Sequence, residues 1–282
     1  MNSTTASALS LPGPLTFIGG GNMARSLIGG LLAQGVGSTQ LRVAEPMPAA
    51  RDALVREFGI GVHADNADAA RGAACLVLAV KPQVLKAVCQ ELAGVIPPET
   101  LIVSIAAGIT STQIDHWLGG GRPVVRAMPN TPALLGAGAT GLFANTRVTA
   151  DGRATAERLL GAVGRTVWIA DEAQMDVVTA LSGSGPAYAF LLAEAMEAGA
   201  IAQGLPAEAA RLLTVQTLLG AARMLSESGE PAATLRARVT SPGGTTQAAI
   251  ESLEAAGFRQ HVTAAIAAAT RRGVALSRAA GG

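Results

Sequence analysis

Charged and aromatic side chains are scarce in this chain. Of its 282 residues, 15% are charged and 3% are aromatic, whereas 49% are hydrophobic. Soluble domains usually carry about 25% charged residues, and such a deficit is typical of proteins that cover part of their surface by assembling into oligomers. The net charge is +1 and no basic run is present, which argues against nucleic acid as a partner.

Cysteines, histidines and long apolar runs are also scarce. Cys75 and Cys89 form no CxxC pair, so we expect reduced core residues in a cytoplasmic protein. The three histidines, His63, His116 and His261, lack metal-ligand spacing, and no metal site is expected. No apolar run reaches the roughly 18 residues that span a bilayer, so no membrane partner is expected. Residues 1–14 have no charged segment ahead of an apolar one, and they are expected to form a disordered leader.

The length favours two domains, and the first part alternates short apolar runs with helical stretches. A run that is apolar throughout, such as Cys75–Val80, is typical of a strand buried on both faces of a parallel sheet. Residues 15–171 are therefore predicted to form a Rossmann-like, doubly wound α/β domain that binds a dinucleotide. The predicted strands are 15–18, 40–44, 75–80, 101–105 and 123–127, and predicted helices include 22–34 and 48–58.

After Asp171 the strand pattern ends, and residues 172–282 are predicted to form an all-α domain. Its predicted helices are 175–203, 207–226, 246–255 and 259–279. Several are apolar nearly all round, as Ala193–Ala202 shows, and a helix of that kind has to be buried. Because these helices cannot fully cover one another, we expect a second protomer to pack against them.

A glycine-rich turn, Gly19–Ala24, follows the first predicted strand and opens the first predicted helix. This is the context of a dinucleotide-binding fingerprint. Gly19 permits the tight turn, and Gly21 lets the backbone approach a pyrophosphate, which then lies at a helix N-terminus. The second strand ends at Glu45, where a carboxylate accepts hydrogen bonds from ribose hydroxyls and repels a 2′-phosphate. Arg51 could counter that repulsion, so NADH is favoured without excluding NADPH.

Three further segments end predicted strands, at the sheet edge where ligands bind in open α/β sheets. In Ala79–Pro82, Lys81 could reach a ribose or a phosphate, and the proline opens a helix. The small residues of Ala106–Gly108 leave room for a nicotinamide ring. Asn130 follows another strand and is expected near the same crevice.

The helical part carries two polar segments. Leu181–Tyr188, which contains Ser184, is by itself a weak signal. Ser241–Thr246 is a stronger one, because its N–H groups and hydroxyls converge ahead of a helix, a layout suited to a small anion.

Taken together, these residues show that the chain resembles the pyrroline-5-carboxylate reductases, which catalyse the last step of proline biosynthesis. The resemblance runs from about Leu15 to the last helix, and the Ser241–Thr246 motif is specific to that family. The matching segments are Phe17–Ala24, Ala79–Pro82, Ala106–Gly108, Met128–Pro132, Ala180–Tyr188 and Ser241–Thr246.

The resemblance implies roles for individual residues. The expected cofactor-binding residues are Ile18, Gly19, Gly20, Gly21, Asn22, Met23, Glu45, Asn66, Ala79, Val80, Lys81, Pro82, Ala106, Ala107 and Gly108. The expected substrate-binding residues are Gly243, Gly244, Thr245, Thr246, Ser184 and Asn130. Thr246 is the expected catalytic residue, because a threonine hydroxyl of this loop meets the ring nitrogen in the family. Many members have a small or polar residue at the position of Glu45 and favour NADPH.

The implied reaction is NADH- or NADPH-dependent reduction of 1-pyrroline-5-carboxylate to L-proline, by homodimers that the family often stacks into decamers. Three alternatives remain at this point. A β-hydroxyacid dehydrogenase is disfavoured, because the helix from Ala187 to Gln203 has no lysine to polarise an alcohol. A reductase for another cyclic imine depends on pocket shape. A non-catalytic NAD(P)-binding regulatory protein is disfavoured by the complete Ser241–Thr246 loop.

Overall fold

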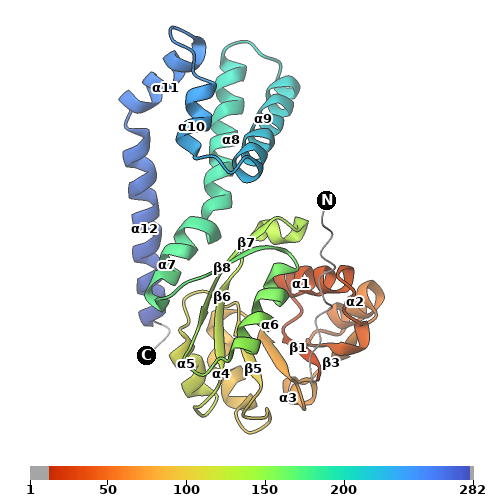
Figure 1. The fold of residues 1–282 in the computed structure, drawn as a ribbon. Helices are drawn as coiled ribbons and strands as arrows, with labels where there is room; N and C mark the ends of the chain where they lie inside the picture. Colours follow the sequence, from red (N-terminus) through yellow and green to blue (C-terminus); the bar gives the residue numbers. More distant parts are fainter. Residues whose placement is uncertain (1–12, 280–282) are drawn as a thin grey trace. The chain divides into compact units, whose positions relative to one another are not determined.

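The structure is a computed structural model that describes residues 13–279, so the expected leader lies outside the described residues except for Gly13 and Pro14. The chain divides into two compact units. In the described part, the first unit comprises residues 13–184 and 269–279, and the second comprises residues 185–268. This division lies later in the chain than the boundary after Asp171 expected from the sequence, and it returns the end of the last helix to the first unit (Figure 1).

The first unit is built on one eight-stranded sheet, with the strand order β3-β2-β1-β4-β5-β6-β7-β8. Its strands are β1 (Leu15–Ile18), β2 (Leu41–Ala44), β3 (Gly61–His63), β4 (Cys75–Leu78), β5 (Leu101–Ser104), β6 (Val124–Met128), β7 (Gly138–Ala144) and β8 (Gly164–Trp168). The strands from β3 to β6 pair in parallel. The order reverses between β1 and β4, which makes the carboxyl ends of these strands a topological switch point.

Strand β7 runs antiparallel to β6 and parallel to β8. The link from β6 to β7 holds only the 3₁₀ turn Thr131–Leu135, which is too short for the crossover of about a dozen residues that a parallel neighbour requires. The predicted strands of the sheet are confirmed to within two residues at each end, whereas β3, β7 and β8 were not predicted.

Helices cover both faces of the sheet. They are α1 (Asn22–Ala33), α2 (Pro48–Phe58), α3 (Asn66–Ala70), α4 (Pro82–Leu92), α5 (Ser111–Trp117) and α6 (Ala150–Gly161). Alternate residues of one strand enter different cores: Val77 of β4 packs in the cluster with α1, α2 and α6, and Leu78 packs in the cluster with α3, α4 and α5. Cys75 and Cys89 are confirmed as buried, free core residues, and burial raises the pKa of each thiol to about 12.

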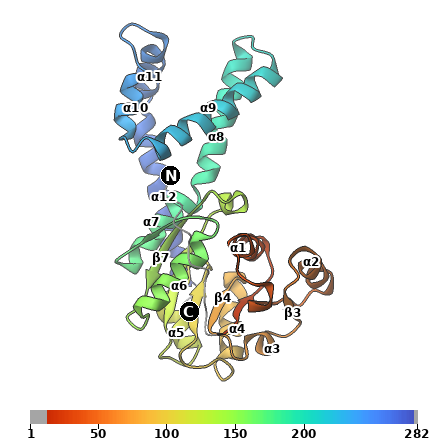
Figure 2. The same cartoon turned by 45° about the vertical axis from the view of Figure 1, so that its right-hand side comes forward.

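The predicted helix 175–203 is wrong in one respect, because it is interrupted. The structure has α7 (Met175–Val178), a π-helical turn (Thr179–Gly183) and α8 (Gly185–Ala202) in its place. The rest of the second unit contains α9 (Ala207–Glu227), α10 (Ala232–Arg238), α11 (Thr245–Ala255) and most of α12 (Phe258–Ala279), whose last residues belong to the first unit. The short helix α10 was not predicted (Figure 2).

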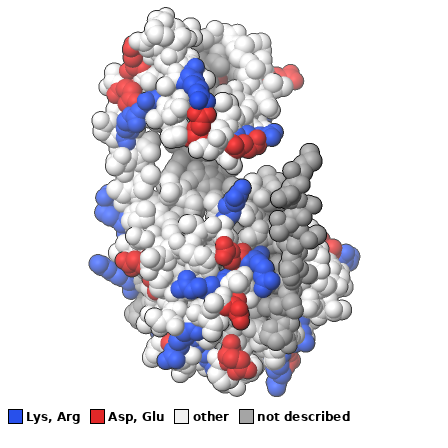
Figure 3. Space-filling view, in the orientation of Figure 1, with Lys and Arg blue, Asp and Glu red and all other residues white. Residues whose placement is uncertain are grey.

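The helices of the second unit expose much apolar surface. Helix α8 has no buried residue, and Phe190, Leu191 and Leu212 are 65%, 66% and 65% exposed. Charged residues are few and scattered on the face seen in Figure 3, with both signs interspersed. No helix in the described part of the chain is long and apolar enough to cross a membrane.

Candidate active site

The glycine-rich turn joins β1 to α1 in the conformation that the sequence predicts. Gly19 has a left-handed backbone with φ of 99°, and a Cβ placed there would lie 2.8 Å from the Ala79 carbonyl oxygen. The space above Gly21 is open, because a Cβ there would meet no atom within 4 Å. No side chain caps the start of α1. The first-turn N–H groups of α1 and the open space at Gly21 therefore fit the pyrophosphate of a dinucleotide.

Glu45 follows β2 beside this turn. Its carboxylate accepts hydrogen bonds from the N–H of Gly20 at 3.1 Å and from the N–H of Met47 at 3.1 Å. Arg51 does not pair with that carboxylate: its Nη1 donates to the carbonyl oxygens of Glu45 at 2.9 Å and Pro46 at 2.8 Å. The negative charge of Glu45 is therefore fixed at the turn, and Arg51 holds the loop that carries it.

The segment after β4 packs directly under the glycine-rich turn. A Cβ at Gly19 would be 3.1 Å from the Val80 side chain, so Ala79 and Val80 leave no room for a side chain at Gly19. Lys81 is the N-cap residue of α4, and Pro82 occupies its first turn. Asn66 opens α3 and directs its amide to α4, where Nδ2 donates to Glu91 at 3.1 Å.

The loop Ala106–Gly108 follows β5, the neighbour of β4 in the sheet. The Ala106 N–H donates to Ser104 Oγ at 3.3 Å. Gly108 has φ of 74°, and a Cβ there would lie 3.6 Å from Leu276 of α12. The structure thus brings the expected cofactor segments that follow β1, β2, β4 and β5 to adjacent positions along one edge of the sheet.

Asn130 is buried, and both ends of its amide are bonded within the protein. Nδ2 donates to the Ser182 carbonyl at 3.0 Å, and Oδ1 accepts from the N–H of Ala139 at 2.9 Å. The amide therefore fixes the π-helical turn to the start of β7. Ser184 ends this turn, and its N–H donates to the Thr179 carbonyl at 2.9 Å. π-Helical turns of this kind frequently mark functional sites.

The Ser241–Thr246 loop lies in the second unit and leads into α11. Gly243 has φ of 70°, and its N–H donates to Gln247 Oε1 at 2.7 Å. The Gly244 N–H donates to the Ser241 carbonyl at 3.1 Å. Gly244 is the N-cap residue and offers no side-chain cap, so the first-turn N–H groups of Thr245 and Thr246 are the donors that an incoming anion meets.

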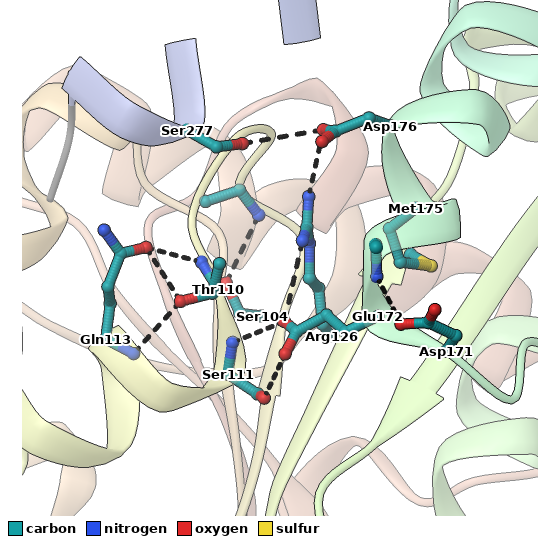
Figure 4. A network of polar contacts seen from close by, with 12 residues as sticks. Ser104, Thr110, Ser111, Gln113, Arg126, Asp171, Glu172, Met175, Asp176 and Ser277 are labelled. Atoms are coloured by element: carbon teal, nitrogen blue, oxygen red, sulfur yellow. Dashed lines mark hydrogen bonds and ion pairs between the residues drawn. The ribbon is translucent and has the colours of Figure 1, made fainter. Parts of the chain in front are cut away.

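A buried charge network in the first unit was not predicted from the sequence (Figure 4). Arg126 of β6 is 4% exposed, and its guanidinium lies 3.5 Å from Glu172 and 3.7 Å from Asp176. The one available signal was an arginine inside an otherwise apolar strand, because a buried charge requires partners. The three histidines lie on separate elements, and within residues 13–279 no group of three His, Cys, Asp or Glu side chains could hold a metal.

In comparisons with known proteins, the two parts of the chain match two different family models. Residues 172–276 match the family model for pyrroline-5-carboxylate reductase dimerisation, and residues 14–108 match the model for NADP oxidoreductase, coenzyme F420-dependent. A pyrroline-5-carboxylate reductase from Pseudomonas aeruginosa is 54% identical over 95% of this chain and 98% of its own length. The chain belongs to the pyrroline-5-carboxylate reductase family.

Solved structures of the family share the fold. A pyrroline-5-carboxylate reductase from Coxiella burnetii superposes with a TM-score of 0.91 at 44% identity, covering 94% of this chain and 98% of that one. The enzyme from Plasmodium falciparum, solved with NADP bound, gives a TM-score of 0.82 at 28% identity, over 94% of this chain and 98% of that one. The resemblance and the fold class predicted from the sequence are confirmed, and the chain is an NAD(P)H-dependent oxidoreductase with a helical dimerisation domain.

Proposed function

We propose that the chain reduces 1-pyrroline-5-carboxylate to L-proline with NADH or NADPH, in the cytoplasm. The observation that carries this proposal is the start of α11. Gly243 turns the backbone in the left-handed region beside open space, and the uncapped first turn then presents N–H groups next to two threonine hydroxyls. A small carboxylate with an adjacent ring nitrogen matches this arrangement.

The nucleotide is held by the sheet edge of the first unit. The first turn of α1 binds the pyrophosphate through the N–H groups of Asn22 and Met23, and Glu45 accepts from the ribose hydroxyls. Lys81 lies at the ribose and phosphate, and Asn66 contacts the adenosine half. The Ala106–Gly108 loop, which has no side chain larger than a methyl group, accommodates the nicotinamide ring. When bound, the cofactor supplies the hydride.

The substrate is held by the second unit. The N–H groups of Thr245 and Thr246 hold its carboxylate, while Gly243 and Gly244 keep the approach free of side chains. The imine nitrogen is protonated from solvent, and its N–H donates to the Thr246 hydroxyl, which orients the ring. As hydride adds to C5, the π electrons of the C=N bond become the lone pair of nitrogen. Positive charge is lost in this step, so no strong general acid is required.

Asn130 and Ser184 are the two residues of the first unit that are expected to take part in substrate binding. Because the Asn130 amide is bonded to Ser182 and Ala139, it contributes by holding the turn that ends at Ser184 rather than through a bond of its own to the substrate. The hydroxyl of Ser184, which follows that turn, is proposed to bind the substrate.

Replacement of Thr246 tests the catalytic assignment. Thr246→Ala should lower kcat/KM for 1-pyrroline-5-carboxylate by about tenfold to a thousandfold, with the Kd for NADH unchanged. 1-Pyrroline, which lacks the carboxylate, should be a poorer substrate by about a hundredfold or more. Thr263→Ala, which removes a hydroxyl that donates to the Arg259 carbonyl one turn earlier in α12, is the matched control. Unchanged kinetics in Thr246→Ala would remove this residue from the site.

We also propose that the apolar faces of the second unit form the homodimer and that dimers stack into a decamer. The mass of the particle in solution should then be about ten times that of the 28.2 kDa chain. Phe190→Asp places a charge on an exposed apolar face of α8 and should release smaller species. A monomeric wild-type protein in light scattering would contradict the assembly.

A further inference from the structure

We propose that Glu172 is a positioning residue for the Ala106–Gly108 loop and that it acts through Ser111. Glu172 follows Asp171 in the connection after β8 and begins the 3₁₀ turn Glu172–Gln174. Its two carboxylate oxygens accept from both hydrogen-bond donors of Ser111: Oε1 from the N–H at 2.6 Å and Oε2 from the hydroxyl at 2.7 Å. Ser111 is 2% exposed and is the first residue of α5 after the loop.

The carboxylate of Glu172 is itself held in place. Arg126 approaches Oε1 of Glu172 at 3.5 Å and Asp176 at 3.7 Å from the other nitrogen of its guanidinium. Asp176 also accepts from the Ser277 hydroxyl of α12 at 3.5 Å, as Figure 4 shows. Two carboxylates thus face one guanidinium, and the donors of Ser111 help to compensate the excess negative charge. Charged groups with this many partners have little freedom to move.

The capping box of α5 does not reach Ser111. In that box Thr110 Oγ1 accepts from the Gln113 N–H at 3.2 Å and the Gln113 side chain accepts from the Thr110 N–H at 2.7 Å, so the N–H of Ser111 takes its acceptor from Glu172. A buried ion pair is also a weak source of stability, because desolvation offsets most of its attraction. What Glu172 adds is a fixed position for Ser111, imposed from 61 residues away in the chain.

The position of Ser111 determines that of the loop. The Ala106–Gly108 loop lies between Ser104 and Ser111. Its other restraints are the bond from the Ala106 N–H to Ser104 Oγ and the burial of Ile109, which is 1% exposed. Gly108 meanwhile packs against Leu276 and Ser277 of α12. Hydride transfer is sensitive to errors of about 1 Å in placement, which can lower the rate about a hundredfold. Through Ser111, Glu172 therefore fixes the position of the Ala106–Gly108 loop, against which the nicotinamide ring lies.

The test has an arm that needs no cofactor. Hydrogen exchange of the amides of residues 106–111 is measured in nucleotide-free protein for Glu172→Ala, Ser111→Ala and the double variant. Glu172→Ala should speed this exchange on the order of tenfold, and the double variant should exchange no faster, since Glu172→Ala already removes the hydroxyl bond that Ser111→Ala breaks. Glu172→Gln, which keeps one carbonyl oxygen as an acceptor, is the milder variant if Glu172→Ala does not fold. Glu157→Ala, which removes an exposed carboxylate of α6, should exchange as the wild type does.

The kinetic arm rests on the proposed reductase activity. With 1-pyrroline-5-carboxylate, kcat of Glu172→Ala should fall about tenfold to a hundredfold, while the Kd for NADH changes by less than about threefold. The primary isotope effect with 4-deuterated NADH should rise, because hydride transfer becomes slower. Unchanged exchange of residues 106–111, additive effects in the double variant, or kcat falling only with the folded fraction would each overturn the proposal. A wild-type protein that does not reduce the imine would instead overturn the proposed function and leave the exchange result to decide the role of Glu172.

Discussion

At the scale of single residues, hydrogen bonds decide which charges a ligand meets. Glu45 and Arg51 lie six positions apart, and the sequence allows either to dominate a ribose site. In the structure Arg51 is committed to two main-chain carbonyls, whereas the Glu45 carboxylate is held at the glycine-rich turn by two N–H groups. A 2′-phosphate placed there would meet a fixed negative charge, so the chain should prefer NADH to NADPH.

Glu45→Gln tests this preference. The amide keeps a carbonyl oxygen for the turn but removes the charge, so the ratio of kcat/KM for NADPH to that for NADH should rise about tenfold, the effect of roughly 1.4 kcal/mol less repulsion. Glu99→Gln, at the opposite edge of the sheet before β5, is the control and should leave the ratio unchanged. If Glu45→Gln also leaves it unchanged, ribose selectivity arises elsewhere.

At the scale of elements, two adjacent glycines of α1 differ in how closely neighbouring segments pack against them. A Cβ at Gly30 would lie 2.6 Å from the Ala162 carbonyl oxygen and 2.8 Å from Val163, whereas a Cβ at Gly29 would meet Phe58 at 3.5 Å, an ordinary contact. Gly30 therefore allows α1 to approach the segment between α6 and β8.

The two substitutions should have opposite effects on stability. Gly29→Ala gains helix propensity and should raise the free energy of unfolding by about 0.5–1 kcal/mol. Gly30→Ala gains the same propensity but overpacks the contact, and it should lower that free energy by about 1–3 kcal/mol. Denaturant unfolding of both variants measures the difference. Equal effects in the two variants would show that the packing at Gly30 yields without cost.

Elements with strong local patterns could be predicted from the sequence, and those that depend on distant contacts could not. Strand β4 is a continuous apolar run, and α2 begins at Pro48 and ends before Gly59, so both were predicted. Strand β7 contains Gly141, whose Cβ would lie 2.5 Å from Val178; this glycine serves packing against α7 and weakens the strand pattern. The π-helical turn depends on the Asn130 bond to Ser182, across 52 residues.

The same limit applies to the candidate site. The glycine-rich turn, the loops after β4 and β5 and the start of α11 have local motifs, and their residue roles remain predictions. The contact of Glu172 with Ser111 has no local pattern, because its partners come from β6, α5 and the segment after β8. Only the folded sheet brings them together.

At the scale of the whole molecule, the low charge content and the exposed apolar helices have one explanation. The second unit belongs to a dimerisation family, and Phe190, Leu191 and Leu212 are each more than half exposed in the single chain. Apolar surface of this extent is typical of an interface. The low content of charged residues, which distinguishes this chain from an average soluble domain, is therefore explained by the packing of its helical unit against a second copy.

The measurement that tests the central claim most directly is steady-state reduction of 1-pyrroline-5-carboxylate with NADH and NADPH in parallel, followed by the loss of reduced nicotinamide and the appearance of proline. We expect turnover with both cofactors and a higher kcat/KM with NADH. Turnover with neither cofactor, in protein that still binds nucleotide, would contradict the assignment and would point to a different imine or to a regulatory role.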